Sequence, residues 1–234
     1  MSTHTVKAFD QELTDLGRRI AEMGGIAERM LADATTALDK ADIELAQSVI
    51  EADPRLDAME RELEERAILM IAKRQPLAVD LRTVVSSLRI AADLERIGDL
   101  SKNIARRVVA IDGRFPSPKI VGGVKHMSEL AQDRLKRVID AYAERDVTEA
   151  IDIWENDEEI DQMHGSLFRE LLTYMMEDPR NIGFCAHLLF CAKNIERIGD
   201  HATNIAETVH YLATGAVIVS ERPRDTSAYK TVDG

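Results

Sequence analysis

Hydrophobic side chains recur every three to four residues along most of the chain, which is the period of an amphipathic helix. Six stretches follow this pattern, at residues 9–38, 43–73, 77–111, 124–143, 147–176 and 180–214. Hydrophobic residues make up 45% of the 234 residues, enough to form a substantial core. The pattern therefore predicts an all-α protein of six long helices.

Proline and glycine mark most of the breaks between these stretches. The segment 113–123 (GRFPSPKIVGG) holds two prolines and three glycines and is the clear internal linker. Pro54 is an exception, because it falls inside the second stretch, where a proline removes a backbone hydrogen bond. At the matching place in the second half, Asp157 is followed by Glu158, with no proline. We therefore expect that helix to be continuous, and the second helix to continue, kinked, through Pro54.

The chain contains an internal repeat. Residues 94–99 read LERIGD, and residues 195–200 read IERIGD. Further upstream, residues 50–53 (IEAD) match residues 154–157 (WEND), which puts the tryptophan of the second segment at a core position. The repeat predicts two pseudo-symmetric halves of three helices each.

These patterns give a domain plan for the whole chain. The expected parts are a first half at 1–113, a linker at 114–122, a second half at 123–215 and an arm or disordered tail at 216–234. The tail is predicted because the helical period ends there. Only 4% of the residues are aromatic and 31% are charged, which is typical of long helices packed on one another.

Charge and cysteine usage limit the classes of function. The formal net charge of -12 argues against binding to nucleic acid or to anionic lipid, and favours cations or basic proteins as partners. Cys185 and Cys191 lie six apart on a predicted helix, where their side chains diverge, so they predict neither a disulfide nor a metal site. The charged N-terminus is unlike a secretory signal, and the uncharged stretch at 208–220 is too short to span a bilayer. We expect a soluble protein of the cytoplasm with no membrane insertion.

The repeated motif carries the candidate chemistry. Glu95 and Asp99 are four residues apart and project from one side of a helix, nearly opposite its hydrophobic face. Asn103 and its match Asn204 extend these stripes of oxygen ligands. With the acidic pairs of the neighbouring helices, the predicted ligands are Asp53, Asp57, Glu95 and Asp99 in the first half, and Asp157, Asp161, Glu196 and Asp200 in the second.

Four carboxylates that converge without lysine or arginine among them repel one another unless a cation neutralises them. Oxygen ligands alone favour magnesium, manganese, calcium or iron over zinc. The alternative is a solvated acidic face, whose residues pair with the nearby cations Arg55, Arg96, Lys102 and Arg197. The double occurrence favours a metal site, although a duplicated ancestor would also duplicate harmless residues.

Other motifs point to no catalytic class. His164 and His201 lie beside the acidic motifs but have no counterpart in the first half. Glu207 and His210 form a single Glu-x-x-His, whereas a carboxylate-bridged di-iron bundle uses two. The sequence contains no phosphate-binding Gly-x-x-x-x-Gly-Lys loop and no Gly-x-Ser-x-Gly elbow. The rival hypotheses are an oxygen-activating di-iron metalloenzyme and a metal-free helical scaffold.

Four segments, taken in order, resemble the PhoU family of phosphate-signalling accessory proteins. They are KRQP (73–76), LERIGDLSKNI (94–104), TYMMEDPR (173–180) and FCAKNIERIGDHATNIAE (190–207). The resemblance covers roughly residues 6–213 and includes both halves.

The resemblance implies a pair of three-helix bundles related by pseudo-symmetry, often as a homodimer. It implies a protein without catalysis that negatively regulates the phosphate-starvation response. Such a protein is expected to connect the ATPase subunit of the phosphate ABC transporter to a membrane sensor histidine kinase, and to hold the kinase inactive when phosphate is plentiful. It also implies iron, manganese or magnesium, bound as multinuclear sites on the outer surface of each bundle by the eight carboxylates named above.

Overall fold

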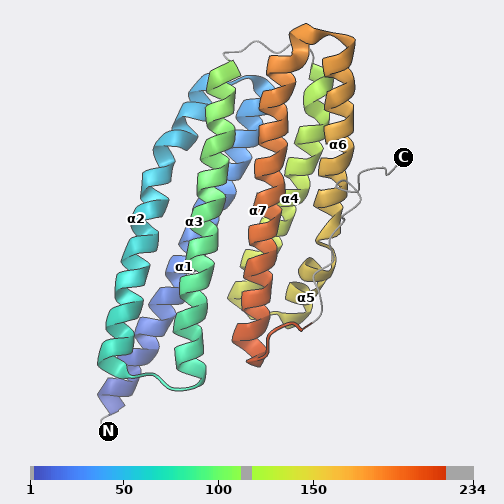
Figure 1. The fold of residues 1–234 in the computed structure, drawn as a ribbon. Helices are drawn as coiled ribbons and strands as arrows, with labels where there is room; N and C mark the ends of the chain where they lie inside the picture. The colour runs from blue at the N-terminus through green and yellow to red at the C-terminus, as the bar shows by residue number, and fades with distance from the viewer. Residues whose placement is uncertain (1–2, 112–117, 220–234) are drawn as a thin grey trace.

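The computed structural model describes residues 3–111 and 118–219 (Figure 1). All regular structure within these two ranges is helical, which confirms the predicted all-α class. The elements in chain order are α1 (Thr3–Lys40), α2 (Ile43–Arg74), α3 (Val79–Ile111), α4 (Pro118–Glu144), α5 (Val147–Glu155), α6 (Glu158–Glu177), the short 3-10 helix η1 (Pro179–Asn181) and α7 (Ile182–Thr214).

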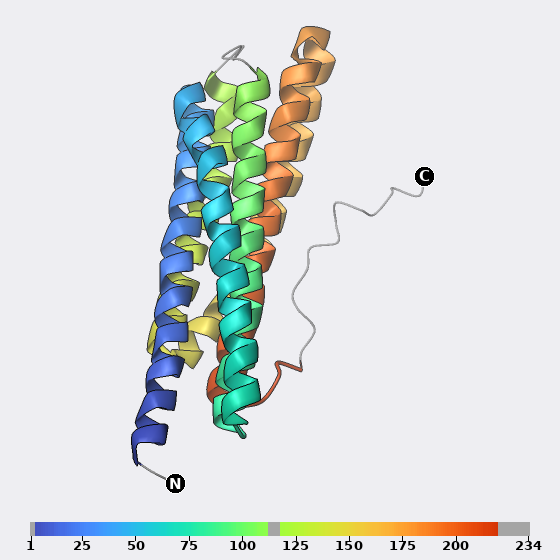
Figure 2. The ribbon, with the colours of Figure 1, turned by 90° about the vertical axis from the view of Figure 1, so that its left-hand side faces the viewer.

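The helices form two bundles, which confirms the predicted pair. The first bundle consists of α1, α2 and α3, and the second of α4, α7 and the two shorter helices α5 and α6. The bundles lie side by side as elongated rods, joined mainly by α3 against α7 and by α1 against α4 (Figures 1 and 2). One apolar cluster runs through both bundles. Ile97 and Ile104 of α3, with Ile198 and Ile205 of α7, are fully buried members of it, and each contributes about 1.5–3 kcal/mol of burial free energy.

The helix α2 is continuous through Pro54, as the repeat predicts. It begins after Asp42, whose side chain accepts a hydrogen bond from the backbone N–H of Leu45 at 2.9 Å. It ends at Gln75, which adopts a left-handed conformation with φ of 49° and donates its backbone N–H to the carbonyl oxygen of Ile71. These caps fix the two ends of the helix, and hence the position along α3 at which Asp53 and Asp57 lie.

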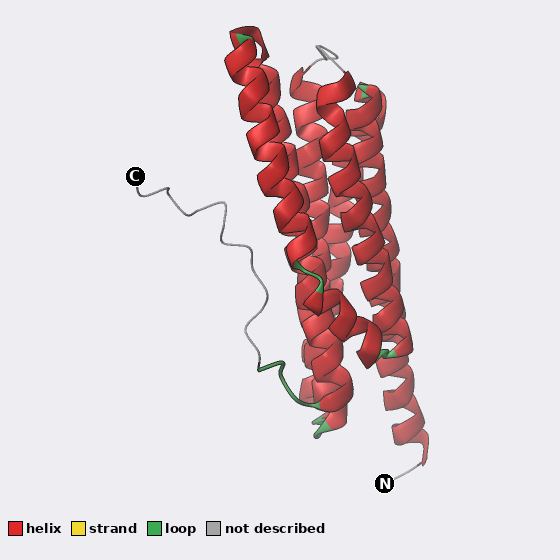
Figure 3. Ribbon diagram, turned by 90° about the vertical axis from the view of Figure 1, so that its right-hand side faces the viewer, coloured by secondary structure: helices red, strands yellow, loops and turns green. Residues whose placement is uncertain are grey.

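The prediction of one continuous helix at 147–176 is wrong. The chain breaks into α5 and α6 around Asn156 and Asp157, and Figure 3 shows a short turn between the two segments. Arg134 of α4 supplies hydrogen bonds to two backbone carbonyls at this break, from Nη2 to Asn156 at 2.6 Å and from Nη1 to Asp157 at 3.4 Å. A buried guanidinium thus replaces partners that a continuous helix would have provided.

The predicted linker at 114–122 is too long, because α4 already begins at Pro118. Proline is well suited to a first helical position, where its missing N–H would have no partner inside the helix. Residues 112–117, which hold the rest of the linker, lie outside the described residues. Of the predicted tail, residues 216–219 have no regular structure, and residues 220–234 also lie outside the described part.

Candidate metal centre

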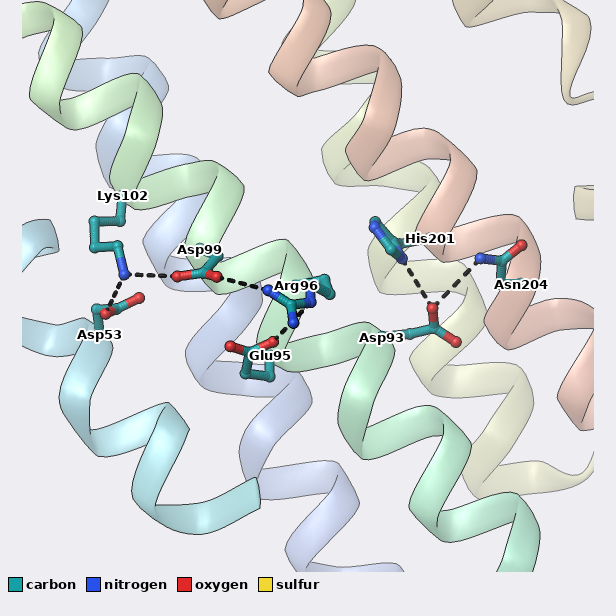
Figure 4. A network of polar contacts seen from close by, with 8 residues as sticks. All are labelled: Asp53, Asp93, Glu95, Arg96, Asp99, Lys102, His201 and Asn204. Atoms are coloured by element: carbon teal, nitrogen blue, oxygen red, sulfur yellow. Dashed lines mark hydrogen bonds and ion pairs between the residues drawn. The ribbon is translucent and has the colours of Figure 1, made fainter. Parts of the chain in front are cut away.

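The first carboxylate cluster lies where α2 and α3 pack against each other (Figure 4). Asp53 projects from α2, and Glu95 and Asp99 project from α3. The two helices approach closely here because Gly98 has no side chain: an added β-carbon would overlap the Cδ2 methyl of Leu56. The glycine of the repeated motif therefore allows the acidic residues of the two helices to meet.

Lys102 lies between the carboxylates of the two helices. Its Nζ donates to Asp53 Oδ2 at 2.5 Å and to Asp99 Oδ1 at 2.6 Å. Burial alone would lower the pKa of Lys102, but the hydrogen bonds to the two aspartates raise it above its ordinary value, so the ammonium stays charged. Arg96 adds a second cation on the exposed side, with Nη1 3.1 Å from Asp99 Oδ2 and Nε 3.4 Å from Glu95 Oε2.

The second cluster lies where α7 packs against the junction of α5 and α6. Asp157 is only 4% exposed. Arg134 places Nη1 3.2 Å from Asp157 Oδ1, and Thr203 of α7 donates its hydroxyl to the same oxygen at 2.7 Å. The carboxylate of Asp157 is therefore held from the interior of the bundle, by a cation on α4 and a hydroxyl on α7.

The other three acidic residues of this cluster are half-buried around Asp157. Burial, followed by the negative charges of Asp157, Glu196 and Asp200, raises the pKa of Asp161 to about 6. The carboxylates of Asp157, Glu196 and Asp200 thus add to the effect of burial at Asp161. Lys193 pairs with Glu196 at 2.6 Å from a side chain that is 46% exposed. Its positive charge also acts to lower the pKa of Asp161, but it offsets the effects of burial and of the neighbouring acids only in part.

The first cluster shows similar crowding at Glu95. Burial raises the pKa of its carboxyl, and the charges of Asp99 and Asp57 add to this effect, although Arg96 works against it. Glu95 and Asp161 thus interact with acidic residues on both of the packed helices in their own halves. The predicted carboxylates of each half therefore lie near one another, on the two helices that pack together there.

Two features of the predicted sites are wrong. Cations do lie among the carboxylates, since Lys102 bridges the first cluster and Arg134 holds the second. In addition, Asp53 and Asp157 do not face outward but are 5% and 4% exposed. Among the residues that the structure describes, no three His, Cys, Asp or Glu side chains are positioned to hold one metal ion together.

The donor chemistry of both clusters fits a hard cation. Carboxylate oxygens come from two packed helices in each half, which is the ligand type that magnesium, manganese and iron accept. In the first cluster the ammonium of Lys102 already occupies the position of a cation between Asp53 and Asp99. The residues that could hold a metal ion there are the eight predicted carboxylates, and this assignment stays a prediction.

Arg134 could not be predicted from the sequence, because the repeat contains no signal for it. A β-carbon added at Gly98 would lie 3.7 Å from Cε of Met30, which is on α1. A β-carbon added at Gly199 would lie 3.8 Å from Nη1 of Arg134. Methionine and arginine thus occupy matching places in the two bundles. A search for shared residues cannot find a contact that only one half makes.

Asn204 takes part in a contact between the bundles. Its Nδ2 lies 3.4 Å from Asp93 Oδ1, and His201 Nδ1 lies 2.9 Å from the same oxygen (Figure 4). This contact engages the amide nitrogen of Asn204, and the role of its oxygen as a ligand stays a prediction. The prediction that His201 serves packing rather than metal binding agrees with this contact across α3 and α7.

The Glu-x-x-His motif does not form half of a di-iron site. Glu207 accepts a hydrogen bond from Trp154 Nε1 at 3.0 Å, while His210 Nδ1 lies 3.1 Å from the carbonyl oxygen of Ala216. Trp154 is buried, as its match to the first half predicts. Both side chains of the motif are therefore engaged in structural contacts.

Cys185 and Cys191 are free and buried. Burial raises the pKa of Cys191 to about 12 and also raises the pKa of Cys185. None of the helices in the described residues is both long enough and apolar enough to cross a membrane.

Comparison with known proteins defines the class. The family model described as the PhoU domain matches the chain twice, at residues 20–108 and 124–209, one match in each bundle. The chain belongs to the PhoU family.

Named relatives cover nearly its whole length. The phosphate-specific transport system accessory protein PhoU homolog of Rhizobium meliloti is 60% identical over 222 residues, which is 95% of this chain and 94% of the relative. The protein of the same name from Caulobacter vibrioides is 49% identical over 224 residues, 96% of this chain and 97% of that one. The crystal structure of PhoU from Pseudomonas aeruginosa superposes with a TM-score of 0.86 at 39% identity, covering 89% of this chain and all of that one.

Proposed function

We propose that this protein is a regulatory accessory protein of a phosphate-specific transport system and that it represses the phosphate-starvation response. The observation that carries the proposal is the 60% identity, over almost the full length, to a relative named as such an accessory protein. The phosphate transport system regulatory protein PhoU from Streptococcus pneumoniae, with a TM-score of 0.82 at 28% identity, supports the regulatory role.

The protein acts by stoichiometric binding and not by catalysis. It contacts the ATPase subunit of the phosphate ABC transporter and a sensor histidine kinase, and holds the kinase inactive when phosphate is plentiful. The net charge of -12 suits basic partner surfaces. Apolar side chains such as Leu77, 80% exposed after α2, and Met176, 84% exposed at the end of α6, offer contact area for helical partner segments.

The two carboxylate clusters bind metal ions within this function. Iron, manganese or magnesium would supply the positive charge that crowded carboxylates require, and would fix the spacing of the helices that carry them. The raised pKa values of Glu95 and Asp161 support this role. Burial, and after it the charges of neighbouring carboxylates, raise them, and a bound cation would offset both effects. The chain's own residues bind and orient the metal, and no reaction is assigned to it.

The protein works in the cytoplasm, as a homodimer. The buried free thiols of Cys185 and Cys191 support a reducing compartment. Size-exclusion chromatography with light scattering measures the assembly directly, and a monomer at micromolar concentration would contradict the homodimer.

A gene deletion tests the regulatory function. In a strain that carries a phosphate-responsive reporter, deletion is expected to switch the reporter on in phosphate-rich medium, and the wild-type gene should restore repression. The matched control is Lys125→Thr, which removes only a surface ion pair with Asp39 and should complement fully. Unchanged reporter expression after deletion would contradict the proposal.

A further inference from the structure

A groove of about 450 Å³ lies between α4 and α6, which pack side by side in the second bundle (Figure 1). Its floor is apolar, because Leu167 is only 4% exposed and Met163 packs against the core. Gly123, Ser166 and Glu170 also line it. A β-carbon added at Gly123 would lie 2.7 Å from Leu167 Cδ1 and 3.7 Å from Glu170 Oε2. The α4–α6 groove is therefore open where position 123 has no side chain.

The two bundles match residue by residue along the helices that form this groove. One constant shift along the sequence relates buried residues of the first bundle to buried residues of the second. The pairs are Met23 and Met127, Asp53 and Asp157, and Leu63 and Leu167. The groove between α4 and α6 can therefore be compared directly with the matching place between α1 and α2.

An ion pair fills the matching place in the first bundle. The same shift relates Gly123 to Arg19 of α1 and Ser166 to Glu62 of α2. Arg19 Nη1 lies 2.6 Å from Glu62 Oε2, the arginine side chain is only 22% exposed, and its Nε is buried. The first bundle thus shows that an arginine side chain fits against these two helices. The second bundle lacks both members of the pair.

The charges beside the groove also differ between the bundles. Arg55 and Arg66 of α2 match Glu159 and Glu170 of α6, and both glutamates line the groove. The charge of Glu170 acts on Tyr174, whose pKa is raised first by burial and then by this charge. Neither glutamate forms an ion pair with a lysine or arginine in the described part of the chain. Both are available to a cation that enters the groove.

Two basic side chains of the second bundle lie close to the groove without filling it. Arg169, which is exposed, donates to Ser166 Oγ at 3.2 Å. His126 lines the groove, but its Nδ1 lies 3.6 Å from Glu129 and its side chain is 65% exposed. Neither of them takes the place over Leu167 that matches Arg19.

We propose that the α4–α6 groove binds an arginine side chain of a partner protein, in the place that matches Arg19 of the first bundle. The aliphatic stem lies over Gly123 against Leu167, and the guanidinium pairs with the carboxylate of Glu170. Glu159 lies about 16 Å along α6 from Glu170 and takes a second cation of the same partner segment. The inference rests on partner binding in the proposed function, and adds to it a surface and the side chain that it recognises.

An NMR titration of the full chain with labelled leucine methyl groups tests the recognition. The probe is an alanine-rich helical peptide that carries two arginines. Its twin carries two citrullines, which keep the shape of arginine and lose the charge. We expect the arginine peptide to shift the methyl signals of Leu167 in a saturable way, and the twin to bind at least about fivefold more weakly.

Two variants close the groove or remove its charge. Gly123→Arg with Ser166→Glu builds the ion pair of the first bundle into the groove, and it should weaken binding of the arginine peptide at least about tenfold. Glu159→Gln with Glu170→Gln changes only exposed side chains, and it should weaken binding at least about fivefold. In the deletion strain with the phosphate-responsive reporter, neither variant should restore full repression.

Gly122→Arg is the matched control. It adds the same charge to α4 one residue away, where an added β-carbon meets nothing within 4 Å. This variant should bind the arginine peptide and repress the reporter as the wild type does.

The remaining outcomes separate this inference from the proposed function. No binding, equal affinity for the two peptides, or full repression by both groove variants would overturn the inference and leave the regulatory function intact. Equally tight binding of spermidine would identify a site for small polyamines, and dissociation of a dimer by Gly123→Arg with Ser166→Glu would identify a second copy as the occupant; either result would overturn it. Unchanged reporter expression after gene deletion would contradict the proposed function, and the peptide titration would still decide whether the groove recognises arginine.

Discussion

Gly98 of α3 packs directly against Leu56 of α2, so closely that an added β-carbon would overlap the Cδ2 methyl of the leucine. Gly199 and Ile160 repeat this relationship in the second bundle, where the added β-carbon would lie 2.9 Å from Ile160 Cδ1. The aspartate of each motif follows its glycine directly. Close helix packing and the meeting of the carboxylates therefore have the same cause.

Gly98→Ala should destabilise the protein by up to about 2 kcal/mol. The overlap with Leu56 costs about 1–3 kcal/mol, and the better helix propensity of alanine returns about 1 kcal/mol. The control is Gly25→Ala in α1, where an added β-carbon meets nothing within 4 Å and only the gain in propensity remains. Urea unfolding measures both, and equal stability changes for the two variants would contradict the packing argument.

Arg134→Met should destabilise the protein by about 3 kcal/mol or more. The substitution removes the cation beside the buried Asp157 carboxylate and the donor at the break between α5 and α6. Methionine is the residue at the matching place in the first bundle, so its size suits the interior. Arg18→Met is the matched control, because Arg18 pairs with Asp15 from a side chain that is 75% exposed, and its loss should cost under about 0.5 kcal/mol. A loss below 1 kcal/mol for Arg134→Met, measured by urea unfolding, would show that Arg134 is dispensable.

The fold was largely predictable from the sequence, and the reasons are physical. The helical period placed α1, α2, α3 and α7 to within a few residues, and the repeat gave the two bundles. The break at Asn156 was not predictable from the repeat. The helix α2 is continuous although it contains Pro54, whereas the matching segment of the second half contains no proline and yet breaks into α5 and α6. A tertiary contact from Arg134 decides that difference, and local propensity does not.

The candidate site was predictable only in part. The spacing of four residues predicts that Glu95 and Asp99 lie on one side of a helix, and the repeat predicts that Asp53 lies near them. Neither the spacing nor the repeat predicts how deeply each carboxylate is buried. Lys102 lies three residues beyond Asp99, and the sequence indicates an ordinary surface pair for it only under the alternative of a solvated acidic face. The contact of Lys102 with Asp53 depends on how closely α2 approaches α3, and residue spacing within one helix cannot predict that distance.

Asp161→Asn should stabilise the metal-free protein at neutral pH. The pKa of Asp161 is about 6 in the folded state against an ordinary 3.8, so its ionisation opposes folding above pH 6 and has no effect below the ordinary value. We expect a gain of about 1 kcal/mol at pH 7.5, reduced by solvent screening, that fades as the pH falls towards 4.

Urea unfolding at the two pH values measures this dependence. Asp133→Asn is the control, because Asp133 is 67% exposed on α4, and it should change stability by under about 0.5 kcal/mol at either pH. A loss of stability for Asp161→Asn at pH 7.5 would mean that the carboxylate has a favourable partner in the folded protein.

Both cysteines should resist thiol reagents in the native protein at pH 8. Cys185 and Cys191 are buried, and the thiolate is the reactive form, which the raised pKa values suppress. Labelling with a chromogenic disulfide reagent should be slow in buffer and should reach two thiols per chain in denaturant. Rapid labelling of the native protein would show that α7 opens readily.

Metal content after loading tests the central claim that the two carboxylate clusters exist to bind cations. The protein is dialysed against saturating manganese and freed of excess metal, and its manganese content is measured by elemental mass spectrometry. Two double variants are treated in the same way: Asp57→Asn with Glu95→Gln, and Asp161→Asn with Glu196→Gln. We predict stoichiometric manganese in the wild type, loss of the metal of one bundle in each variant, and loss of all of it when the two are combined. Wild-type protein that retains no stoichiometric metal, or a combined variant that retains as much as the wild type, would contradict this claim.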